Sequence, residues 1–215
     1  MSLCSWGDFL DEVMVDLPGC QVPVAVNAIK NAVEWICKET KVLVQDCTAL
    51  DVVTGVGSYT FAPPSSDVMI VQMDELRYAG YEDPLDPITR ENANAQFPTW
   101  QTQTGVVYYW MGTGPRAVQL INVPDRDITG GLKGRAVVMP VRTATGPDEL
   151  FLTHFREEVA AGAKYRLMLQ PKKPYTNPAE AVYFEEKFRN AVGKAAVLKA
   201  TGFGNARIRT KTYAR

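Results

Sequence analysis

Residues 162–195, GAKYRLMLQPKKPYTNPAEAVYFEEKFRNAVGKA, predict two helices separated by one short proline-rich break. Pro171 and Pro174 end the first helix, because proline lacks the backbone donor and restricts the residue before it. Asn177 and Glu180 then have the spacing of a helix cap and its capping-box acid. We therefore expect a helical hairpin whose arms are each about 24 residues long, or ~36 Å.

Both arms of this hairpin are rich in small residues, which would let the two helix backbones approach closely. Apolar residues at helical spacing mark the face of the first arm that would be buried. Such a hairpin is typical of a stiff structural element. The residues expected to form its contact are Ala160, Ala163, Leu167, Phe188 and Ala195.

The rest of the chain divides into a helical N-terminal part and a β-rich middle. Ser5 is placed to cap a short helix, with Asp8 well positioned at its start, and residues 23–40 repeat apolar side chains at helical spacing. Between residues 42 and 145, short β-prone runs are separated by Gly, Pro and Asp. We therefore predict an α+β fold: a helical bundle, made of an N-terminal helical hairpin (residues 1–41) and the C-terminal helical hairpin (146–204), with an inserted antiparallel β domain (42–145) and a basic tail (205–215).

Within the β domain, GTGP at residues 112–115 predicts the turn of the clearest hairpin. The glycine-rich run at residues 124–134 is interpreted as a loop between strands. In the preceding strand, alternation would bury Tyr109 and place Tyr108 and Trp110 together on the other face. If that other face is exposed, it indicates a protein interface.

The bulk composition is that of an ordinary globular protein, with 215 residues, 46% hydrophobic residues and a net charge of −1. No run of about 18 apolar residues is present, so we expect no membrane span. The N-terminus lacks the pattern of a signal peptide, so the protein should stay where it is made. We expect reduced thiols, and neither a metal site nor a cofactor, from the four cysteines Cys4, Cys20, Cys37 and Cys47.

The two ends of the chain carry opposite charge. Residues 1–29 contain four acids and no Lys or Arg, whereas residues 187–215 contain eight basic residues and no acid. This complementarity could join the ends within one subunit, join neighbouring subunits, or place the basic tail near nucleic acid.

One short motif resembles a catalytic signature. Asp125 and Asp127 lie in a DxDxT pattern at residues 125–129 that opens magnesium-dependent phosphotransferases of the haloacid-dehalogenase type. That chemistry needs the motif at the end of a parallel strand with further acids nearby. Pro124 before the motif and the glycines after it favour a surface turn between two antiparallel strands.

The order of parts resembles the head–tail adaptor (neck or connector) proteins of tailed bacteriophages. HFREEVAAGAKYRLMLQPKKPYTNPAEA at residues 154–181 and SYTFAPP at residues 58–64 carry this resemblance most strongly. In layout the chain is similar to the tubular adaptors of short-tailed phages. The resemblance implies no catalytic residue, and therefore a structural virion protein rather than an enzyme.

The resemblance also implies partners. It implies a homo-oligomeric ring of about 12 subunits that lies beneath the portal protein and is joined to other neck or tail proteins. Genomic DNA would pass through the bore of this ring without sequence-specific binding. No membrane association is implied. The protein would assemble in the host cytoplasm, wait there as a monomer, and end at the head–tail junction of the virion. The residues expected to dock on the portal are Arg207, Arg209, Lys211 and Arg215.

Three other functions remain open from the sequence. The chain could be another tail-completion or stopper module of the neck. It could be a magnesium-dependent phosphotransferase that uses Asp125 and Asp127. It could also bind DNA, although a net charge near zero disfavours this.

Overall fold

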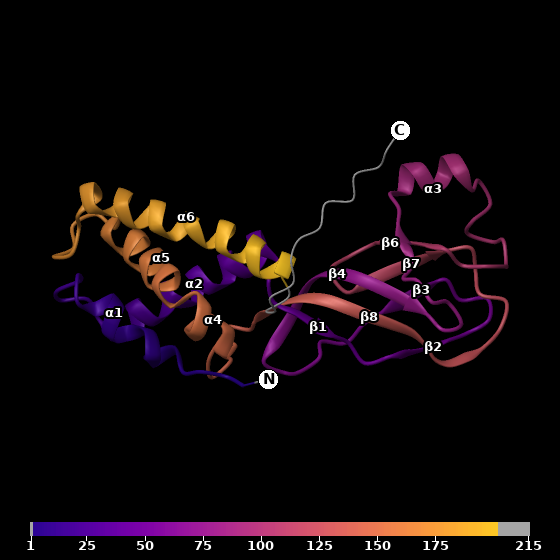
Figure 1. Cartoon of the computed structure of the whole chain (residues 1–215), viewed down its shortest axis with the longest axis horizontal. Coiled ribbons are helices and arrows are strands. Elements are labelled where there is room, and N and C mark those ends of the chain that lie inside the picture. Colours follow the sequence, from indigo (N-terminus) through magenta and orange to yellow (C-terminus); the bar gives the residue numbers. More distant parts are fainter. Residues whose placement is uncertain (1, 202–215) are drawn as a thin grey trace. The chain divides into compact units, whose positions relative to one another are not determined.

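The computed structural model describes residues 2–201, and these form two compact units. The helical unit contains the chain up to Val42 and again from Arg142 onward, and the β unit contains Leu43–Val141. Figure 1 shows helices gathered in the first unit and strands in the second. The α+β class predicted from the sequence is confirmed.

The helical unit is built from six segments (Figure 1). Ser5 accepts from the Gly7 backbone and Asp8 accepts from the Ser5 backbone, so the predicted cap at the start of the first segment is confirmed. The chain returns to this unit at Arg142, whose guanidinium donates to Asn31 at 2.7 Å. The segments are η1 (Trp6–Phe9), α1 (Leu10–Met14), α2 (Val22–Thr40), α4 (Glu149–His154), α5 (Arg156–Met168) and α6 (Pro178–Thr201).

The C-terminal hairpin differs from the prediction in its first arm. The second arm, α6, has 24 residues, but the first is divided at Phe155 into α4 and the 13-residue α5. Phe155 leaves the helical conformation, at φ −125° and ψ 17°, and its ring is fully buried beside that of Phe151. Burial of both rings in one core accounts for the break, because aromatic side chains bury a large apolar area.

The turn of the hairpin follows the predicted chemistry. Met168 ends α5 before Pro171, and the Asn177 backbone N–H donates to the Met168 carbonyl at 3.0 Å. The Asn177 side chain then accepts from the Glu180 backbone at 3.3 Å and donates to the Glu180 carboxylate at 2.7 Å. The predicted cap at Asn177 is therefore confirmed, but a complete capping box is not formed, because Glu180 contacts the Asn177 side chain and the Asn177 backbone N–H is bonded to Met168.

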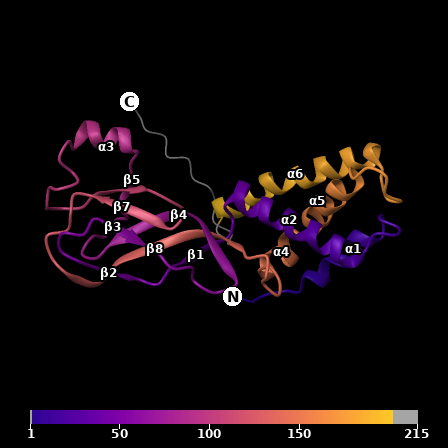
Figure 2. The same cartoon turned by 180° about the vertical axis from the view of Figure 1, so that it is seen from behind.

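The β unit contains two four-stranded sheets and one short helix, seen from behind in Figure 2. In the first sheet β8 is central, because β4 pairs along one of its edges while β1 and β2 pair along the other. The second sheet has the order β3-β7-β6-β5, and its β5–β6 pair is parallel. The elements are β1 (Val44–Asp46), β2 (Leu50–Val52), β3 (Ser58–Thr60), β4 (Val68–Tyr78), β5 (Asp86–Pro87), α3 (Arg90–Gln96), β6 (Tyr109–Gly112), β7 (Ala117–Ile121) and β8 (Ile128–Pro140).

One expectation about this unit is confirmed, and one needs correction. The GTGP turn does join the antiparallel strands β6 and β7. Of the glycine-rich run at residues 124–134, expected to be a loop, residues 128–134 instead form the first half of β8, whereas residues 124–127 do lie in a loop. Its glycines have a packing role, since a Cβ at Gly134 would lie 2.8 Å from the Phe61 ring and 2.7 Å from Met73 Cε.

The aromatic strand β6 is covered on both faces. Trp110 is 5% exposed and its indole donates to the Leu85 carbonyl at 3.1 Å, whereas Tyr109 is half-buried against Phe97. The predicted alternation therefore holds for Tyr109 and Trp110, which lie on opposite faces of β6. The face that carries Trp110 is buried, so the condition for a protein interface there is not met. Tyr108 alone of these three is exposed, just before the strand begins.

Candidate functional site

The groups most often used in catalysis are not brought together in the described residues. No cluster of three or more His, Cys, Asp or Glu side chains that could hold a metal ion is found there. The thiols in residues 2–201 are all free. Burial, reinforced by Asp8, raises the pKa of Cys4 to about 11, and burial raises the pKa of Cys37 as well. These thiols stay protonated at neutral pH and are poor nucleophiles.

The DxDxT motif connects two sheets. Asp125–Asp127 lies between β7 of one sheet and β8 of the other, so the predicted turn between two antiparallel strands is instead a crossover. The Asp127 carboxylate accepts hydrogen bonds from the Thr54 backbone at 2.6 Å and from the Thr54 hydroxyl at 2.8 Å. Gly55 donates to the Pro124 carbonyl at 3.0 Å. Asp127 therefore links its own loop to the loop that contains Thr54, which is a structural role.

This role predicts a pH-dependent contribution of Asp127 to stability. The two Thr54 hydrogen bonds hold the pKa of Asp127 below its usual value of 3.8. A lowered carboxyl pKa stabilises the fold above the unfolded value and ceases to do so as the pH falls through the folded value. We expect Asp127→Asn to lower the urea midpoint more at pH 7 than at pH 3, because the contribution of this carboxylate is already falling at pH 3. Asp125→Asn is the control, because Asp125 has no hydrogen bond in residues 2–201. An equal loss at both pH values would contradict this role.

An open depression in the β unit also lacks a reaction centre. It has a volume of about 660 Å³, and each of the two carboxylates that line it lies beside an arginine. Glu75 contacts Arg77 at 2.6 Å, and Asp46 lies 4.0 Å from Arg135. The carboxylates are thus each held by a cation instead of converging on one another as a general acid and base would.

The α5–α6 contact is the tightest feature of the helical unit. The Phe188 ring of α6 lies directly over Gly162 of α5, where a Cβ would approach within 2.5 Å of the ring. Trp35 of α2 packs on the other side, with 4.4 Å between the ring centroids. The absence of a side chain at Gly162 is therefore what lets the three helices meet. The residues predicted for the hairpin contact are all buried: Ala160, Ala163, Leu167, Phe188 and Ala195.

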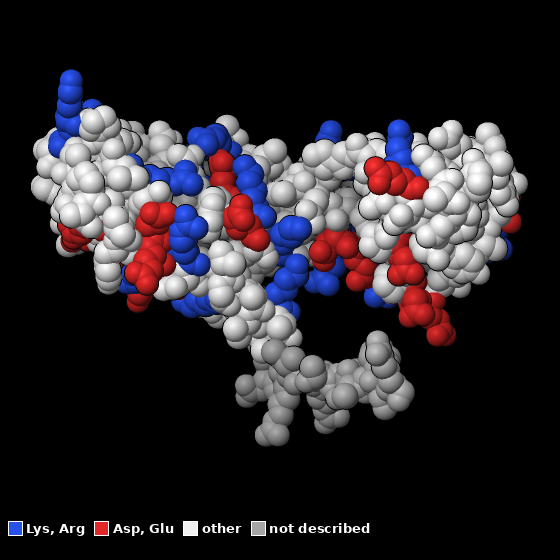
Figure 3. Space-filling model, turned by 90° about the horizontal axis from the view of Figure 1, so that it is seen from above, with Lys and Arg blue, Asp and Glu red and all other residues white. Residues whose placement is uncertain are grey.

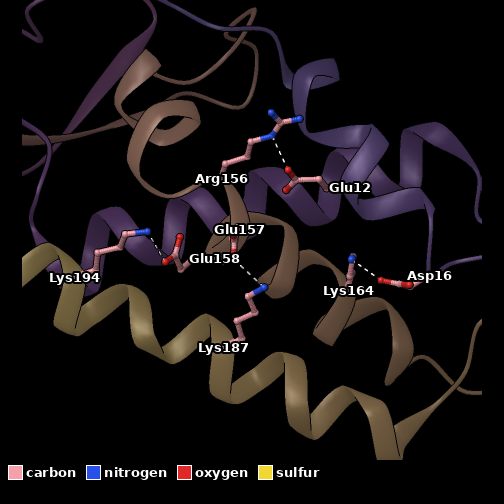
Figure 4. A network of polar contacts seen from close by, with 8 residues as sticks. All are labelled: Glu12, Asp16, Arg156, Glu157, Glu158, Lys164, Lys187 and Lys194. Carbon is pink, nitrogen blue, oxygen red and sulfur yellow. Dashed lines mark hydrogen bonds and ion pairs between the residues drawn. The ribbon is translucent and has the colours of Figure 1, made fainter.

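Ion pairs surround α5 on two sides, as Figure 4 shows. Toward the α1 segment, which is α1 together with the two residues after it (10–16), Arg156 contacts Glu12 at 2.7 Å and Lys164 contacts Asp16. Toward α6, Lys187 contacts Glu157 at 2.9 Å and Lys194 contacts Glu158 at 2.8 Å. Helix α5 thus presents cations to the acidic N-terminal helix and carboxylates to the basic C-terminal one.

This arrangement answers part of the question raised by the charged ends of the chain. In the described residues, the four pairs run from α1 to α5 and from α5 to α6 instead of directly between the two ends. The complementarity is therefore used within the subunit through an intermediary helix. The signal that could have revealed this is the presence of both signs of charge on α5: the cations Arg156 and Lys164 match the acidic end of the chain, and the acids at residues 157–158 match the basic end.

Glu158 differs from the other members of the network because it is buried. Its side chain is only 10% exposed, and one carboxylate oxygen accepts from Lys194. The second oxygen, Oε2, has no hydrogen-bond partner in the described residues. A buried carboxylate needs its cation, since an isolated charge in a protein interior is strongly unfavourable. Lys194 thus helps to hold α6 against α5.

A shallow groove lies beside this network. It has a volume of about 350 Å³, with Ala160 and Ala161 lining it together with the aromatic Phe184. The Lys164 ammonium lies 4.9 Å from the centroid of the Phe184 ring. Glu12 and Val15 of the α1 segment contribute to the same groove. Its charged groups are paired, so its chemistry suits packing against another surface better than a reaction.

The four basic residues predicted to dock on a partner fall outside the described part of the chain. Arg207, Arg209, Lys211 and Arg215 all follow Thr201, where the description ends. Their docking role stays a prediction.

A family comparison gives these observations a context. The family described as SU10 adaptor protein matches residues 5–209, which is nearly the whole chain. The chain belongs to the SU10 adaptor protein family. This is a phage adaptor family of structural proteins and not an enzyme family. A comparison with curated proteins finds no match.

Membership of the SU10 adaptor family agrees with the paired charges and the protonated thiols of this chain. The predicted structural class, a head–tail adaptor of a bacteriophage virion, is supported at the level of the family. Among residues 2–201, the helices are too short or too polar for any of them to cross a membrane.

Proposed function

We propose that this SU10-family adaptor forms a ring beneath the portal of a tailed phage and joins the portal to the tail. The ring would leave a bore for genomic DNA. The observation that carries this proposal is the family match over residues 5–209. Identical subunits that associate through two different surfaces form a ring when the rotation between neighbouring copies closes.

The distribution of charge supports passage of DNA without strong binding. The net charge is −1, and Figure 3 shows basic and acidic side chains interleaved over the face in view. Tight non-specific binding to DNA needs several cations that together neutralise phosphates. On the face in view, acidic side chains lie beside the basic ones and would weaken their attraction for phosphates, so DNA could slide past this face.

The stiffness of the helical unit supports the same role. Gly162, Phe188 and Trp35 bring three helices into close contact, and the ion pairs of α5 fasten the outer helices to the middle one. A subunit that transmits force between a head and a tail benefits from a core that does not deform, and close-packed interiors have low compressibility.

Electron microscopy of the purified chain mixed with portal protein tests the proposal. We expect a ring of about 12 copies on the portal and, in sedimentation velocity, a monomer when the portal is left out. Association only on a template would prevent premature polymers. Portal particles without added density would contradict the adaptor role, and density at another place in the neck would favour a stopper or tail-completion role.

A further inference from the structure

Helix α6 has a second apolar face that nothing in the described chain covers. Its inner face packs in the helical unit, and its outer face is exposed over the last three turns. Val192 is 42% exposed and Val197 is 61% exposed. The exposed small and apolar residues of this outer face, at the i, i+4 and i+8 spacing of one helix side, are Val192, Gly193, Ala196, Val197 and Ala200.

Gly193 on this face has no packing role among residues 2–201. A Cβ built at Gly193 would meet nothing within 4 Å, in contrast to the one at Gly162. Glycine in the middle of a helix is unfavourable relative to alanine. A glycine that the subunit itself does not require fits a close approach by the backbone of another molecule.

The charge near this outer face is basic. From Lys187 onward the chain contains no acid, and Lys199 lies at the margin of the face without an ion pair in residues 2–201. Lys194, by contrast, is already paired with Glu158. The outer face therefore suits a partner surface that is apolar at its centre and acidic around it.

The α1 segment of the same chain offers such a surface. Val15 is 79% exposed, the highest value among the exposed large hydrophobic residues of the described chain. Asp11, one helical turn earlier on the same side, is exposed and has neither an ion pair nor a hydrogen bond in residues 2–201. Residues 1–29 contain no Lys or Arg, so no cation competes there.

We propose that α1 of one copy packs against the outer face of α6 in the next copy. Val15 would lie against Val197 and Gly193, and Asp11 would approach Lys199. Two different surfaces meet in this contact, and such a heterologous pairing forms a closed ring when the rotation between copies permits. The inference rests on the proposed ring and adds the surfaces that hold its neighbours together.

Within one copy, Val15 lines the groove beside Phe184 and Lys187, which precede Val197 on α6 by ten residues or more. The ion pairs that link α1 and α6 to the rest of the unit are made with α5 (Figure 4). Asp11 and Lys199 are left over by this arrangement, one on each outer helix. A second copy satisfies both at once.

Cross-linking in mixtures of two full-length variants tests this contact. Val15→Cys is mixed with Val197→Cys, with and without portal protein, and treated with a short bismaleimide. We expect linked dimers in the mixture and none with either variant alone. Val182→Cys replaces Val197→Cys as the matched control, because Val182 is also on α6 and is 64% exposed, but lies at the other end of the helix. Cross-linking through the native cysteines, which are mostly buried, is measured on the chain without substitutions.

A charge exchange tests the ionic part of the contact independently. Asp11→Lys and Lys199→Glu should each reduce the linked fraction about five-fold, since like charges would face each other. The chain with both changes should recover it, because every contact then has one Lys and one Glu again. Loss of folding could not produce this recovery.

The outcomes separate this inference from the adaptor proposal. Rings on the portal that give no Val15–Val197 link, or a link equal to that of Val182, overturn the inference and leave the proposed function standing. Failure to recover in the double variant also overturns it. A chain that never associates, either at the portal or alone, overturns both proposals.

Discussion

Replacing Gly162 by valine is expected to destabilise the helical unit by about 3 kcal/mol, through overpacking of the core. A Cβ at this position would lie 2.5 Å from the Phe188 ring, which is closer than van der Waals contact permits. The ring has little freedom to move aside, because Trp35 packs against it with 4.4 Å between centroids. Urea unfolding followed by the helical circular dichroism signal measures the loss.

Gly193 provides the matched control for this prediction. Both glycines lie inside helices, and alanine is intrinsically favoured over glycine in a helix by about 1 kcal/mol. Gly193→Ala should therefore raise the stability of the monomer, because nothing lies within 4 Å of the new Cβ. Gly162→Ala should lower the stability of the monomer, although alanine has the same intrinsic helix preference at this position. If both alanine variants were stabilised equally, Phe188 would not depend on the open space at Gly162.

Features specified by short stretches of sequence were predictable. Ser5 with Asp8, and Asn177 with Glu180, satisfy the unpaired backbone donors at helix starts by contacts within three residues, and each cap was found where its spacing indicated. The turn at residues 112–115 follows the same logic. Local chemistry of this kind is independent of the rest of the fold.

Features that depend on distant residues were missed. Phe155 reads as one more apolar position in a continuous helix, and the break there arises from the burial of its ring beside Phe151. Gly134 reads as part of a loop, but its place in β8 is required by the approach of Phe61. Each depends on a partner that no local pattern identifies.

The ion pairs around α5 were predictable only in part. The opposite charge of the two ends was visible in the sequence, but not that a third helix would carry the matching charges for both. The reason is that electrostatic complementarity constrains which surfaces attract each other but not which elements lie between them. The sequence allowed a contact between the two ends or between subunits, and the structure shows that α5 pairs with most of these charges. In residues 2–201, Asp11 and Lys199 remain unpaired.

The second large effect is expected for the removal of the cation beside Glu158. Lys194→Met leaves a carboxylate that is 10% exposed without its partner, and its other oxygen already lacks a hydrogen bond in the described residues. Breaking a fully buried pair costs ~3–5 kcal/mol. Because the Lys194 side chain is 48% exposed, we expect a smaller loss of about 2 kcal/mol in the free energy of unfolding.

Lys187→Met is the control for this prediction, since it removes a similar pair from the same face of α6. Its partner Glu157 is 68% exposed, so water can solvate the carboxylate that remains and the loss should be much smaller. The double variant Lys194→Met with Glu158→Met removes both charges and should regain most of the lost stability, because two apolar side chains can pack where an ion pair was. If the double variant were as unstable as Lys194→Met alone, the effect would come from the lysine side chain's packing and not from an uncompensated buried charge. Equal losses for Lys187→Met and Lys194→Met would likewise show that burial of Glu158 does not set the strength of the α5–α6 attachment.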